Sequence, residues 1–331
     1  MKEALYYQTE KDQQVRCFLC PHHCLLKPDQ KGICRVRVNQ DGLLYSLNYG
    51  RLTSLALDPI EKKPLYHFYP GSQIVSAGTF GCNLACSFCQ NHTIAHQEPE
   101  TQWLSPQDLV LIADRYRPQG SIGVAFTYNE PSIWFEYVRD CAELLQAHEQ
   151  QVVLVTNGYI EAEPLEELLP FIGAMNIDVK AFQDGFYRKL CKASLAEVKE
   201  RVEQAAQQTH VEVTTLIIPG ENDSLQEIGS LAAWLASIDE TIPLHLSRYH
   251  PAYRLDRPST PEKTMLAAQE RAQQYLKFVY LGNIAAGNNQ TNCLECGRLL
   301  IDRSGYQTRI AGLQNGRCPQ CGSEASYIIG K

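Results

Sequence analysis

Residues 81–91 read GCNLACSFCQN and place Cys82, Cys86 and Cys89 in one short loop. A metal centre that is held by protein alone usually takes four ligands. Three thiolates in one loop therefore need either a distant fourth residue or an open position that a non-protein ligand fills. The loop follows QIVSAG (73–78), a short apolar run typical of a buried strand, so we expect the cysteines at the end of a strand.

Further apolar runs follow the cysteine loop and alternate with helix-like segments. The runs cover residues 121–128, 151–156, 175–180, 211–218, 243–249 and, more weakly, 278–282. Helix starts are marked by Ser105-Pro106 with Asp108, by Ser194 with Glu197, by Ser224 with Glu227 and by Thr260-Pro261. This alternation predicts an α/β fold with a parallel sheet, curved into a partial or complete (β/α) barrel, whose chemistry lies at the carboxyl ends of the strands.

The length and the net charge of the chain limit the functions that it can have. The chain of 331 residues suits about two domains or one large barrel. Its net charge of -7, without a run of Lys and Arg, argues against a nucleic-acid partner. The start of the chain lacks the apolar segment of a signal peptide, and no stretch has the roughly 20 apolar residues that span a bilayer. We expect a cytoplasmic protein with no membrane partner.

The chain has 13 cysteines, which in a reducing cytosol point to metal ligation rather than to disulfides. All but two fall into three groups: Cys17, Cys20, Cys24 and Cys34; Cys82, Cys86 and Cys89; and Cys293, Cys296, Cys318 and Cys321. Cys141 recurs at helical spacing with Trp134 and Val138, so we expect it in the core. Cys191 follows the fourth run and is either a hydrogen donor facing the site or a thiol without a chemical role.

Polar residues end most of the predicted strands. TYNEP (127–131) ends the second run, TNG (156–158) follows the third, IDVK (177–180) closes the fourth and PGEND (219–223) follows the fifth; His245 lies within the sixth. Because the carboxyl ends of parallel strands meet at one edge, we expect these residues to share a site with the cysteine loop. Loop capping or surface pairing is the alternative for each of them taken singly.

The CxxxCxFC spacing of Cys82, Cys86 and Cys89 after a first barrel strand resembles the defining motif of the radical S-adenosylmethionine (SAM) superfamily, over about residues 60–285. The resemblance implies a partial (β/α)6 TIM-like barrel in which the three cysteines hold a 4Fe-4S cluster. The amino and carboxylate groups of SAM would chelate the fourth iron. The activity implied is reductive cleavage of SAM to methionine and a 5′-deoxyadenosyl radical that abstracts hydrogen from a substrate. Zinc, with nearby His92, is the alternative for the same triplet.

Within the superfamily, KKPLYHFYPGS (62–72), CQN (89–91), TYNEP, TNG and IDVK resemble the pyruvate formate-lyase activating enzyme branch. TYNEP stands where the better-known activases have GGEP. The resemblance implies that Asn129 and Glu130 bind the amino group of SAM, that Asp178 and His245 contact its ribose, and that Lys180 contacts its carboxylate. A lysine ammonium at the open end of a sheet also suits a carboxylate on charge alone. A purely structural pair between Asp178 and Lys180 is the alternative.

Both ends of the chain carry a further cysteine group. The N-terminal group has the spacing CxxCxxxC with a fourth cysteine ten residues later, which predicts a second metal site. Zinc is the first expectation there and an iron–sulfur cluster the alternative, and His22 or His23 could replace one cysteine. The C-terminal pairs, CLECG (293–297) and CPQCG (318–322), are typical of a zinc ribbon or a rubredoxin-like iron site.

The complete order of motifs resembles the radical SAM enzyme of the AmmeMemoRadiSam system. We expect an N-terminal cysteine-rich module (1–65), a barrel (66–288) and a C-terminal ribbon (289–331), with AAGNNQTN (285–292) as a linker. The resemblance implies an activase-like oxidoreductase with an electron donor such as flavodoxin or ferredoxin, acting on a partner protein. Modification of a small metabolite is a second hypothesis. A non-catalytic metal-binding scaffold or electron carrier is a third.

Overall fold

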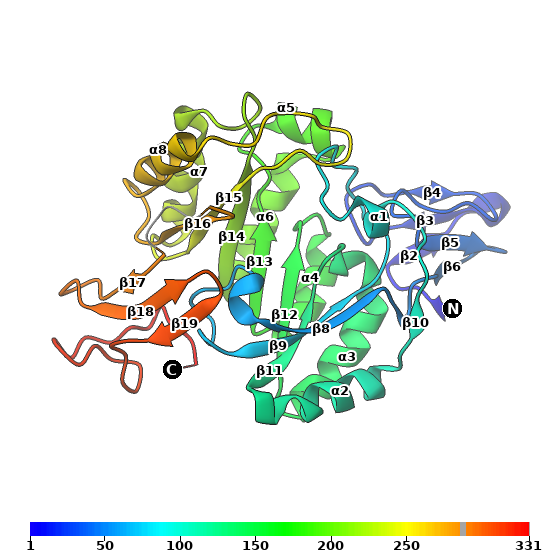
Figure 1. Cartoon of the computed structure of the whole chain (residues 1–331). Helices are drawn as coiled ribbons and strands as arrows, with labels where there is room; N and C mark the ends of the chain where they lie inside the picture. Colours follow the sequence, from blue (N-terminus) through cyan, green and yellow to red (C-terminus); the bar gives the residue numbers. More distant parts are fainter. Residues whose placement is uncertain (285–288, 331) are drawn as a thin grey trace.

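The computed structural model of the chain describes residues 1–284 and 289–330. Its centre is an eight-stranded sheet in the order β16-β15-β14-β13-β12-β11-β9-β8 (Figure 1). The strands are β8 (Ser54–Pro59), β9 (Gln73–Gly78), β11 (Ser121–Phe126), β12 (Gln151–Thr156), β13 (Ala174–Asp178), β14 (His210–Ile217), β15 (Leu244–Arg248) and β16 (Val279–Gly282). Strands β9 to β16 of this sheet run parallel, and β8 and β16 are its edges. The predicted α/β partial barrel is confirmed, and each of the seven predicted runs forms a strand.

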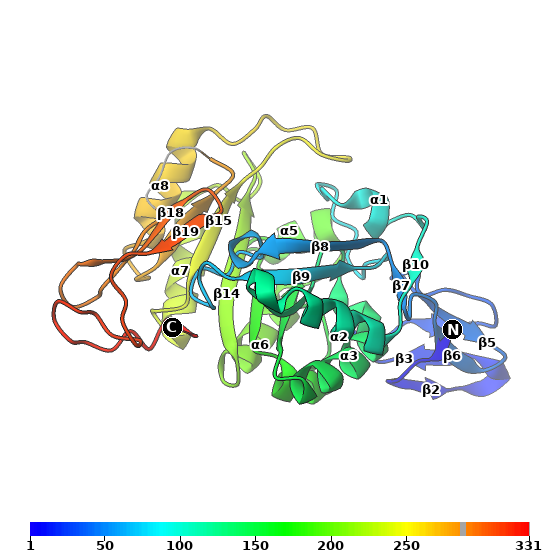
Figure 2. The same cartoon turned by 60° about the horizontal axis from the view of Figure 1, so that its bottom comes forward.

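Six longer helices cover the outer face of this sheet (Figures 1 and 2). They are α2 (Pro106–Arg115), α3 (Phe135–Ala147), α4 (Ala162–Leu168), α6 (Leu195–Ala206), α7 (Leu225–Ile238) and α8 (Glu262–Ala272), while α1 (His92–Ala95) and α5 (Asp184–Phe186) are single turns. The predicted start of α2 is confirmed, because the Ser105 hydroxyl accepts the backbone N–H of Asp108 at 3.1 Å. Helix α8 differs: its N-cap is Pro261, and the buried Thr260 hydroxyl donates to the carbonyl of Ile217 instead.

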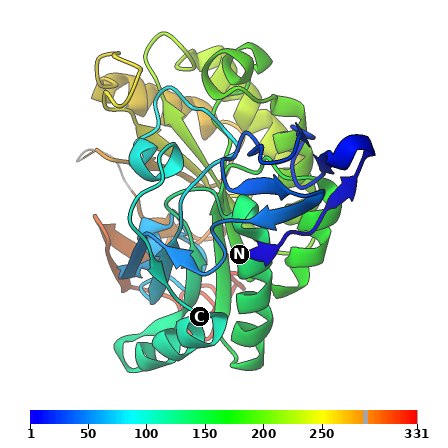
Figure 3. The ribbon, with the colours of Figure 1, turned by 90° about the vertical axis from the view of Figure 1, so that its right-hand side faces the viewer.

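The N-terminal module is built from two small antiparallel sheets. One contains β1 (Lys2–Glu3), β5 (Arg37–Gln40) and β6 (Leu43–Ser46), and the other β2 (Tyr7–Thr9), β3 (Val15–Cys17) and β4 (Leu25–Leu26). Figure 3 shows these strands, in blue, beside the helices of the barrel. The short strands β7 (Arg51–Leu52) and β10 (Gln102–Trp103) pair with each other next to this module.

The predicted boundary of the N-terminal module at residue 65 needs correction. Strand β8, within the predicted module, pairs antiparallel with β9 along its whole length and so belongs to the barrel sheet. The sequence gives little sign of this strand, because β8 is an edge strand and Leu55 in it is exposed. An edge strand of a sheet does not need the continuous apolar run that marks a buried one.

The C-terminal ribbon is a three-stranded antiparallel sheet of β17 (Thr291–Asn292), β18 (Leu299–Ser304) and β19 (Gln307–Ile310). It lies next to β16 (Figure 1), and the hydroxyl groups of Tyr280 in β16 and Thr291 in β17 are 2.8 Å apart. The predicted linker and the boundary at 288/289 fall partly outside the described residues, and the last two linker residues form β17. In the described parts of the chain, no helix has both the length and the apolar character needed to cross a membrane.

Candidate functional site

A cavity of about 430 Å³ opens at the carboxyl ends of the central strands. Most of the residues that we predicted for the site line it: Cys82, Cys86, Cys89, Asn129, Glu130, Asp178 and Lys180. They come from the loops or ends of β9, β11 and β13, which are separate along the sequence. The parallel sheet therefore gathers these polar groups at one rim, as expected of a barrel of this kind.

The cysteine loop is held from both sides by backbone hydrogen bonds. The N–H of Ala85 donates to the carbonyl of Cys191 at 2.9 Å, and the N–H of Ser87 donates to the carbonyl of Leu190 at 3.0 Å. These two carbonyls end a π-helical turn, Tyr187–Cys191. Such turns leave carbonyls free of the regular helical pattern and recur at functional sites. Here the turn fixes the loop that carries the three thiols.

Two glycines allow this loop to start where it does. Gly81 has a φ of +90°, and a Cβ on it would lie 2.7 Å from the carbonyl oxygen of Cys34. A Cβ on Gly78, at the end of β9, would lie 2.8 Å from the ring of Tyr128. Any larger residue at either position would displace the loop, because these distances are shorter than real Cβ contacts.

Glu130 anchors the second rim segment rather than pointing freely into the cavity. Its carboxylate accepts the Thr156 hydroxyl at 2.6 Å and the backbone N–H groups of Asn157 at 2.7 Å and Ser132 at 2.9 Å. Burial raises the pKa of Glu130, although these donors work in the opposite direction. The neighbouring Asn129 side chain donates to the Gly81 carbonyl at 3.0 Å. The TYNEP segment is thus tied to both the cysteine loop and the TNG segment.

Asp178 and Lys180 form the ionic part of the cavity wall. The Nζ of Lys180 lies 2.6 Å from a carboxylate oxygen of Asp178. Burial would lower the pKa of Lys180, but the Asp178 carboxylate raises it overall, so this side chain stays cationic. The pair is half-buried at the cavity surface, which leaves the ammonium available to a bound anion.

The structure does not bring Cys191 into the cavity. Its side chain is fully buried behind the cysteine loop, where the neighbouring Cys191 thiol and burial raise the pKa of Cys86. Cys191 is the last residue of the π-helical turn that supports the loop, which explains why its side chain lies behind the loop. The hypothesis that Cys191 gives hydrogen to a substrate radical is corrected: the thiol faces Cys86.

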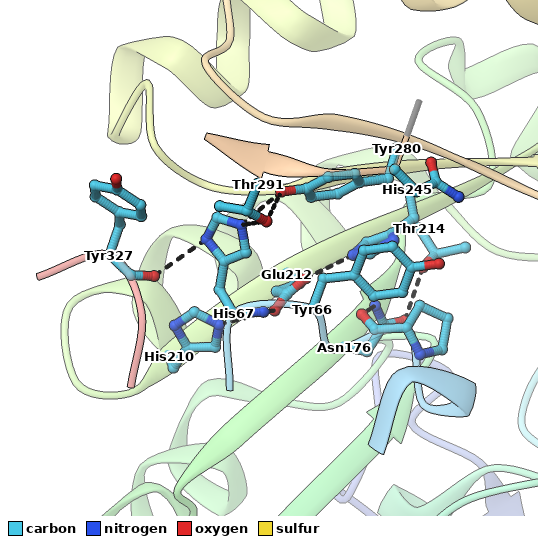
Figure 4. A network of polar contacts seen from close by, with 12 residues as sticks. Tyr66, His67, Asn176, His210, Glu212, Thr214, His245, Tyr280, Thr291 and Tyr327 are labelled. Atoms are coloured by element: carbon cyan, nitrogen blue, oxygen red, sulfur yellow. Dashed lines mark hydrogen bonds and ion pairs between the residues drawn. The ribbon is translucent and has the colours of Figure 1, made fainter. Parts of the chain in front are cut away.

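His245 also lies outside the cavity, because it is not among the residues that line it. Its Nε2 is 2.6 Å from a carboxylate oxygen of Glu212, and both side chains are buried (Figure 4). The Glu212 carboxylate also accepts the backbone N–H of His67 at 2.7 Å and lies 3.1 Å from Nε2 of His210. Burial alone would raise the pKa of Glu212, but its two histidine partners hold it well below its usual value. The ring of His245 is therefore committed to Glu212, and the predicted ribose contact has no support in this geometry.

Thr214 lies between the cavity and the network of polar contacts shown in Figure 4. This cavity-lining residue donates its hydroxyl to the side-chain carbonyl of Asn176 at 3.0 Å, and the Asn176 amide donates to the carbonyl of Pro64 at 2.9 Å. Sequence reasoning missed Glu212 and Asn176. The available signal was a polar residue at every second position at the start of the fifth strand: His210, Glu212 and Thr214. Residues two apart in a strand point to the same face of the sheet, so these three side chains share one face.

Residues 77–232 match the family profile of the Radical SAM superfamily. These residues form a Radical SAM superfamily domain. A radical SAM domain implies a 4Fe-4S cluster and SAM, and most of the residues that line the cavity lie in the matched region. The predicted superfamily is thereby confirmed.

The chain is also similar to curated proteins and to solved structures. A relative named "Uncharacterized protein MJ0808", from Methanocaldococcus jannaschii, is 40% identical over 99% of this chain and 100% of its own. The 7-carboxy-7-deazaguanine synthase of the same organism is 21% identical over 63% of this chain and 88% of its own. SuiB from Streptococcus suis, bound to SAM, superimposes with a TM-score of 0.52 at 14% identity, covering 67% of this chain and 52% of SuiB. A radical SAM methyltransferase from Sphaerobacter thermophilus gives 0.50 at 19% identity, covering 70% and 71%. These two likenesses show the fold alone.

The thiols of this radical SAM domain fit a cluster better than a single ion. The sulfur atoms of Cys82, Cys86 and Cys89 do not all lie within 4.8 Å of one another, whereas the sulfurs around one zinc ion are about 3.8 Å apart. The cavity beside them leaves room for inorganic atoms and a cosubstrate. In the described part of the chain, His92 also belongs to no group of three or more ligand atoms that lie within 4.8 Å of one another, which argues against it as a fourth zinc ligand.

Replacing Cys191 tests its contact with the radical SAM cluster ligand. We expect Cys191→Ala to keep the cluster but to lower its reduction potential. Once Cys86 is bound to iron and has lost its proton, the Cys191 thiol can donate to its sulfur, which stabilises the more negative, reduced state. SAM cleavage should fall by about 10-fold, the lower end of what supporting residues contribute. A redox titration followed by electron paramagnetic resonance (EPR) measures this, with Cys191→Ser as the variant that keeps a donor. An unchanged potential in Cys191→Ala would show that the contact has no effect on the cluster.

The four C-terminal cysteines form a compact group that could hold a metal. The sulfurs of Cys293 and Cys321 are 3.7 Å apart, and those of Cys296 and Cys318 are 3.6 Å apart. All four lie within 4.8 Å of one another. This spacing fits a tetrahedral site for one ion with metal–sulfur bonds of about 2.3 Å. Both zinc and iron bind such a set of four thiolates.

Proposed function

We propose that the protein is an activase-like radical SAM enzyme that generates a 5′-deoxyadenosyl radical and abstracts hydrogen from a partner protein. The observation that carries this proposal is the meeting of three cysteine thiols with the Asp178–Lys180 pair at one cavity on the barrel rim. When bound there, a 4Fe-4S cluster supplies the electron that cleaves SAM. Cys82, Cys86 and Cys89 would hold that cluster.

The chain's own residues would bind and orient SAM. The Lys180 ammonium suits the SAM carboxylate, and the Asp178 carboxylate suits the ribose hydroxyls. The segment from Thr127 to Glu130 would face the amino group. Because the Glu130 carboxylate is taken up by other donors, we propose that this residue orders the segment and that Asn129 and the backbone supply the contacts.

The order of modules and the PLYHFYPG and TYNEP segments support assignment to the AmmeMemoRadiSam system. We propose an external one-electron carrier, a flavodoxin or a ferredoxin, as the reductant. A second candidate, modification of a small metabolite, is favoured by the likeness to 7-carboxy-7-deazaguanine synthase, whose printed name gives a small-molecule product. The scaffold hypothesis is weaker, since it gives the Asp178–Lys180 pair no ligand.

One experiment separates these candidates. The anaerobically reconstituted, reduced protein is mixed with SAM, and 5′-deoxyadenosine is quantified alone, with the macromolecular fraction of a cell extract and with its ultrafiltrate. Stimulation by the macromolecular fraction supports a protein substrate, whereas stimulation by the ultrafiltrate supports a metabolite. A cluster-loaded protein that makes no 5′-deoxyadenosine and shows no EPR change with SAM would overturn the proposed function.

The role of Lys180 has its own expected result. Removing its charge in Lys180→Met should weaken SAM binding by about 10- to 100-fold, because a hydrogen bond to a charged group contributes about 1.5–3 kcal/mol. The matched control is Lys189→Met, which removes an exposed lysine paired with Glu221. A titration of SAM into each cluster-loaded variant measures the affinity. Equal affinity in the two variants would leave the pair with Asp178 as a structural one.

A further inference from the structure

A second pocket, separate from the cavity of the barrel, lies inside the N-terminal module. Its lining includes all four cysteines of the N-terminal group: Cys17, Cys20, Cys24 and Cys34. Cys17 ends β3, Cys20 and Cys24 lie in the turn between β3 and β4, and Cys34 precedes β5. Three of these thiols are buried and Cys24 is half-buried, and none is in a disulfide. Four reduced thiols facing one pocket indicate a metal site.

The spacing of these thiols differs from that in the C-terminal ribbon. In the described part of the chain, only the C-terminal group has three or more ligand atoms that all lie within 4.8 Å of one another. The N-terminal sulfurs are therefore too far apart to surround one ion with metal–sulfur bonds of about 2.3 Å. A cluster with four irons binds one cysteine at each iron, which sets the four sulfurs wider apart.

The pocket between these thiols is small and has mostly apolar walls. Its open volume is about 10 Å³. Gly32 also faces the pocket, and its ideal Cβ position lies 3.7 Å from the sulfurs of both Cys24 and Cys34. The remaining wall is largely apolar, with Leu19, Leu26 and Ile133, which keeps water away.

We propose that Cys17, Cys20, Cys24 and Cys34 bind a 4Fe-4S cluster and not zinc. Such a cluster with four thiolates carries negative charge, and Arg37 supplies a buried cation beside it. One guanidinium nitrogen of Arg37 lies 3.9 Å from the sulfur of Cys17, and the side chain is almost fully buried. The guanidinium also pairs with Glu136 on α3, which fixes its position. Its hydrogen bond to a ligand sulfur favours the reduced state of the cluster.

The proposed cluster lies next to the loop of the barrel cysteines. The residues on both sides of Cys82 touch the N-terminal module: Gly81 packs against the carbonyl of Cys34, and the Asn83 carbonyl lies 2.7 Å from Nε2 of His22. This contact suggests a role that rests on the proposed function. One electron from a reduced ferredoxin or flavodoxin would reduce the N-terminal cluster, which would then be reoxidised by giving that electron to the barrel cluster.

The cluster itself is tested by metal and sulfide analysis of the full chain. A variant without the barrel ligands, with Cys82, Cys86 and Cys89 all replaced by Ala, is reconstituted anaerobically. We expect about four irons and about four acid-labile sulfides per chain, with an EPR signal that does not respond to SAM. Sulfide excludes the C-terminal group as the source, since a rubredoxin-like site contains none. Zinc without sulfide in this variant would overturn the proposal.

Wild-type protein provides a second measurement that does not depend on how the variant folds. We expect about eight irons and eight sulfides as 4Fe-4S clusters by Mössbauer spectroscopy, apart from any iron in the ribbon, and Cys20→Ala should lose about half of them. Cys141→Ala, which removes a buried core cysteine in α3, is the control and should lose none. Only about four cluster irons in wild-type protein would contradict the second cluster.

The electron-transfer role is tested by changing the reductant. Cys20→Ala should make 5′-deoxyadenosine at least about 10-fold more slowly than wild type with a ferredoxin or flavodoxin, but at a similar rate with dithionite, which can reduce the barrel cluster directly. Equal rates with both reductants would overturn the role while leaving the cluster in place. Absence of product from wild-type protein with either reductant would instead count against the proposed function, and the metal analysis would still stand.

Discussion

Cys86→Ala is expected to abolish SAM cleavage, with 5′-deoxyadenosine falling to the background of the uncatalysed reaction. Cys86 is buried at the wall of the main cavity, and its sulfur is near the Lys180 ammonium and the Cys191 thiol. With two thiolates left in the loop, the barrel cannot hold a cluster through three irons and leave the fourth open. Both the electron and the attachment point of SAM are then lost.

The measurement pairs product formation with metal content. Cys86→Ala should lose about four irons relative to wild type and should show no EPR change when SAM is added. Cys141→Ala is the matched control, because its thiol is equally buried but lies in α3 among core residues. Product formation at the wild-type rate in Cys86→Ala would contradict the assignment of the loop as the cluster site.

The sequence could predict the sheet and much of the cavity because both depend on short-range patterns. Buried parallel strands require apolar runs, and each of the seven runs became a strand. Since parallel strands end at one edge, residues placed just after them, such as Cys82 and Asp178, had to meet. The position of a residue directly after a predicted strand was therefore sufficient to predict this part of the site.

The remaining features depend on contacts that sequence spacing does not contain. His245 and Glu212 pair across β14 and β15, and only the register of these strands puts them below the cavity instead of at it. Cys191 faces Cys86 because a π-helical turn docks on the cysteine loop. The motif at residues 17–34 specified four thiols but not the distances between them. Those distances, set by how two small sheets pack, are what favour a cluster over zinc.

Glu136→Gln is expected to destabilise the protein by about 3–5 kcal/mol, the largest effect on stability that we predict. Glu136 on α3 pairs with Arg37 of the N-terminal module, and both side chains are almost completely buried. Glu136 also accepts the backbone N–H of Leu5 at 2.9 Å, while Arg37 donates to the Leu5 carbonyl at 2.7 Å. Removing one charge would leave the guanidinium buried without its counter-ion.

A matched variant on the same helix separates this buried pair from an ordinary surface pair. Glu143 is exposed and lies 3.9 Å from Arg139, so Glu143→Gln should cost no more than about 1 kcal/mol. Denaturant unfolding of the cluster-loaded proteins, kept anaerobic, measures both changes. The double variant Arg37→Met with Glu136→Leu should recover much of the loss, because apolar residues of similar size can replace a buried ion pair. Equal destabilisation by Glu136→Gln and Glu143→Gln would show that the pair does not attach the module to the barrel. Loss of N-terminal iron in a double variant of restored stability would instead assign Arg37 to the second cluster.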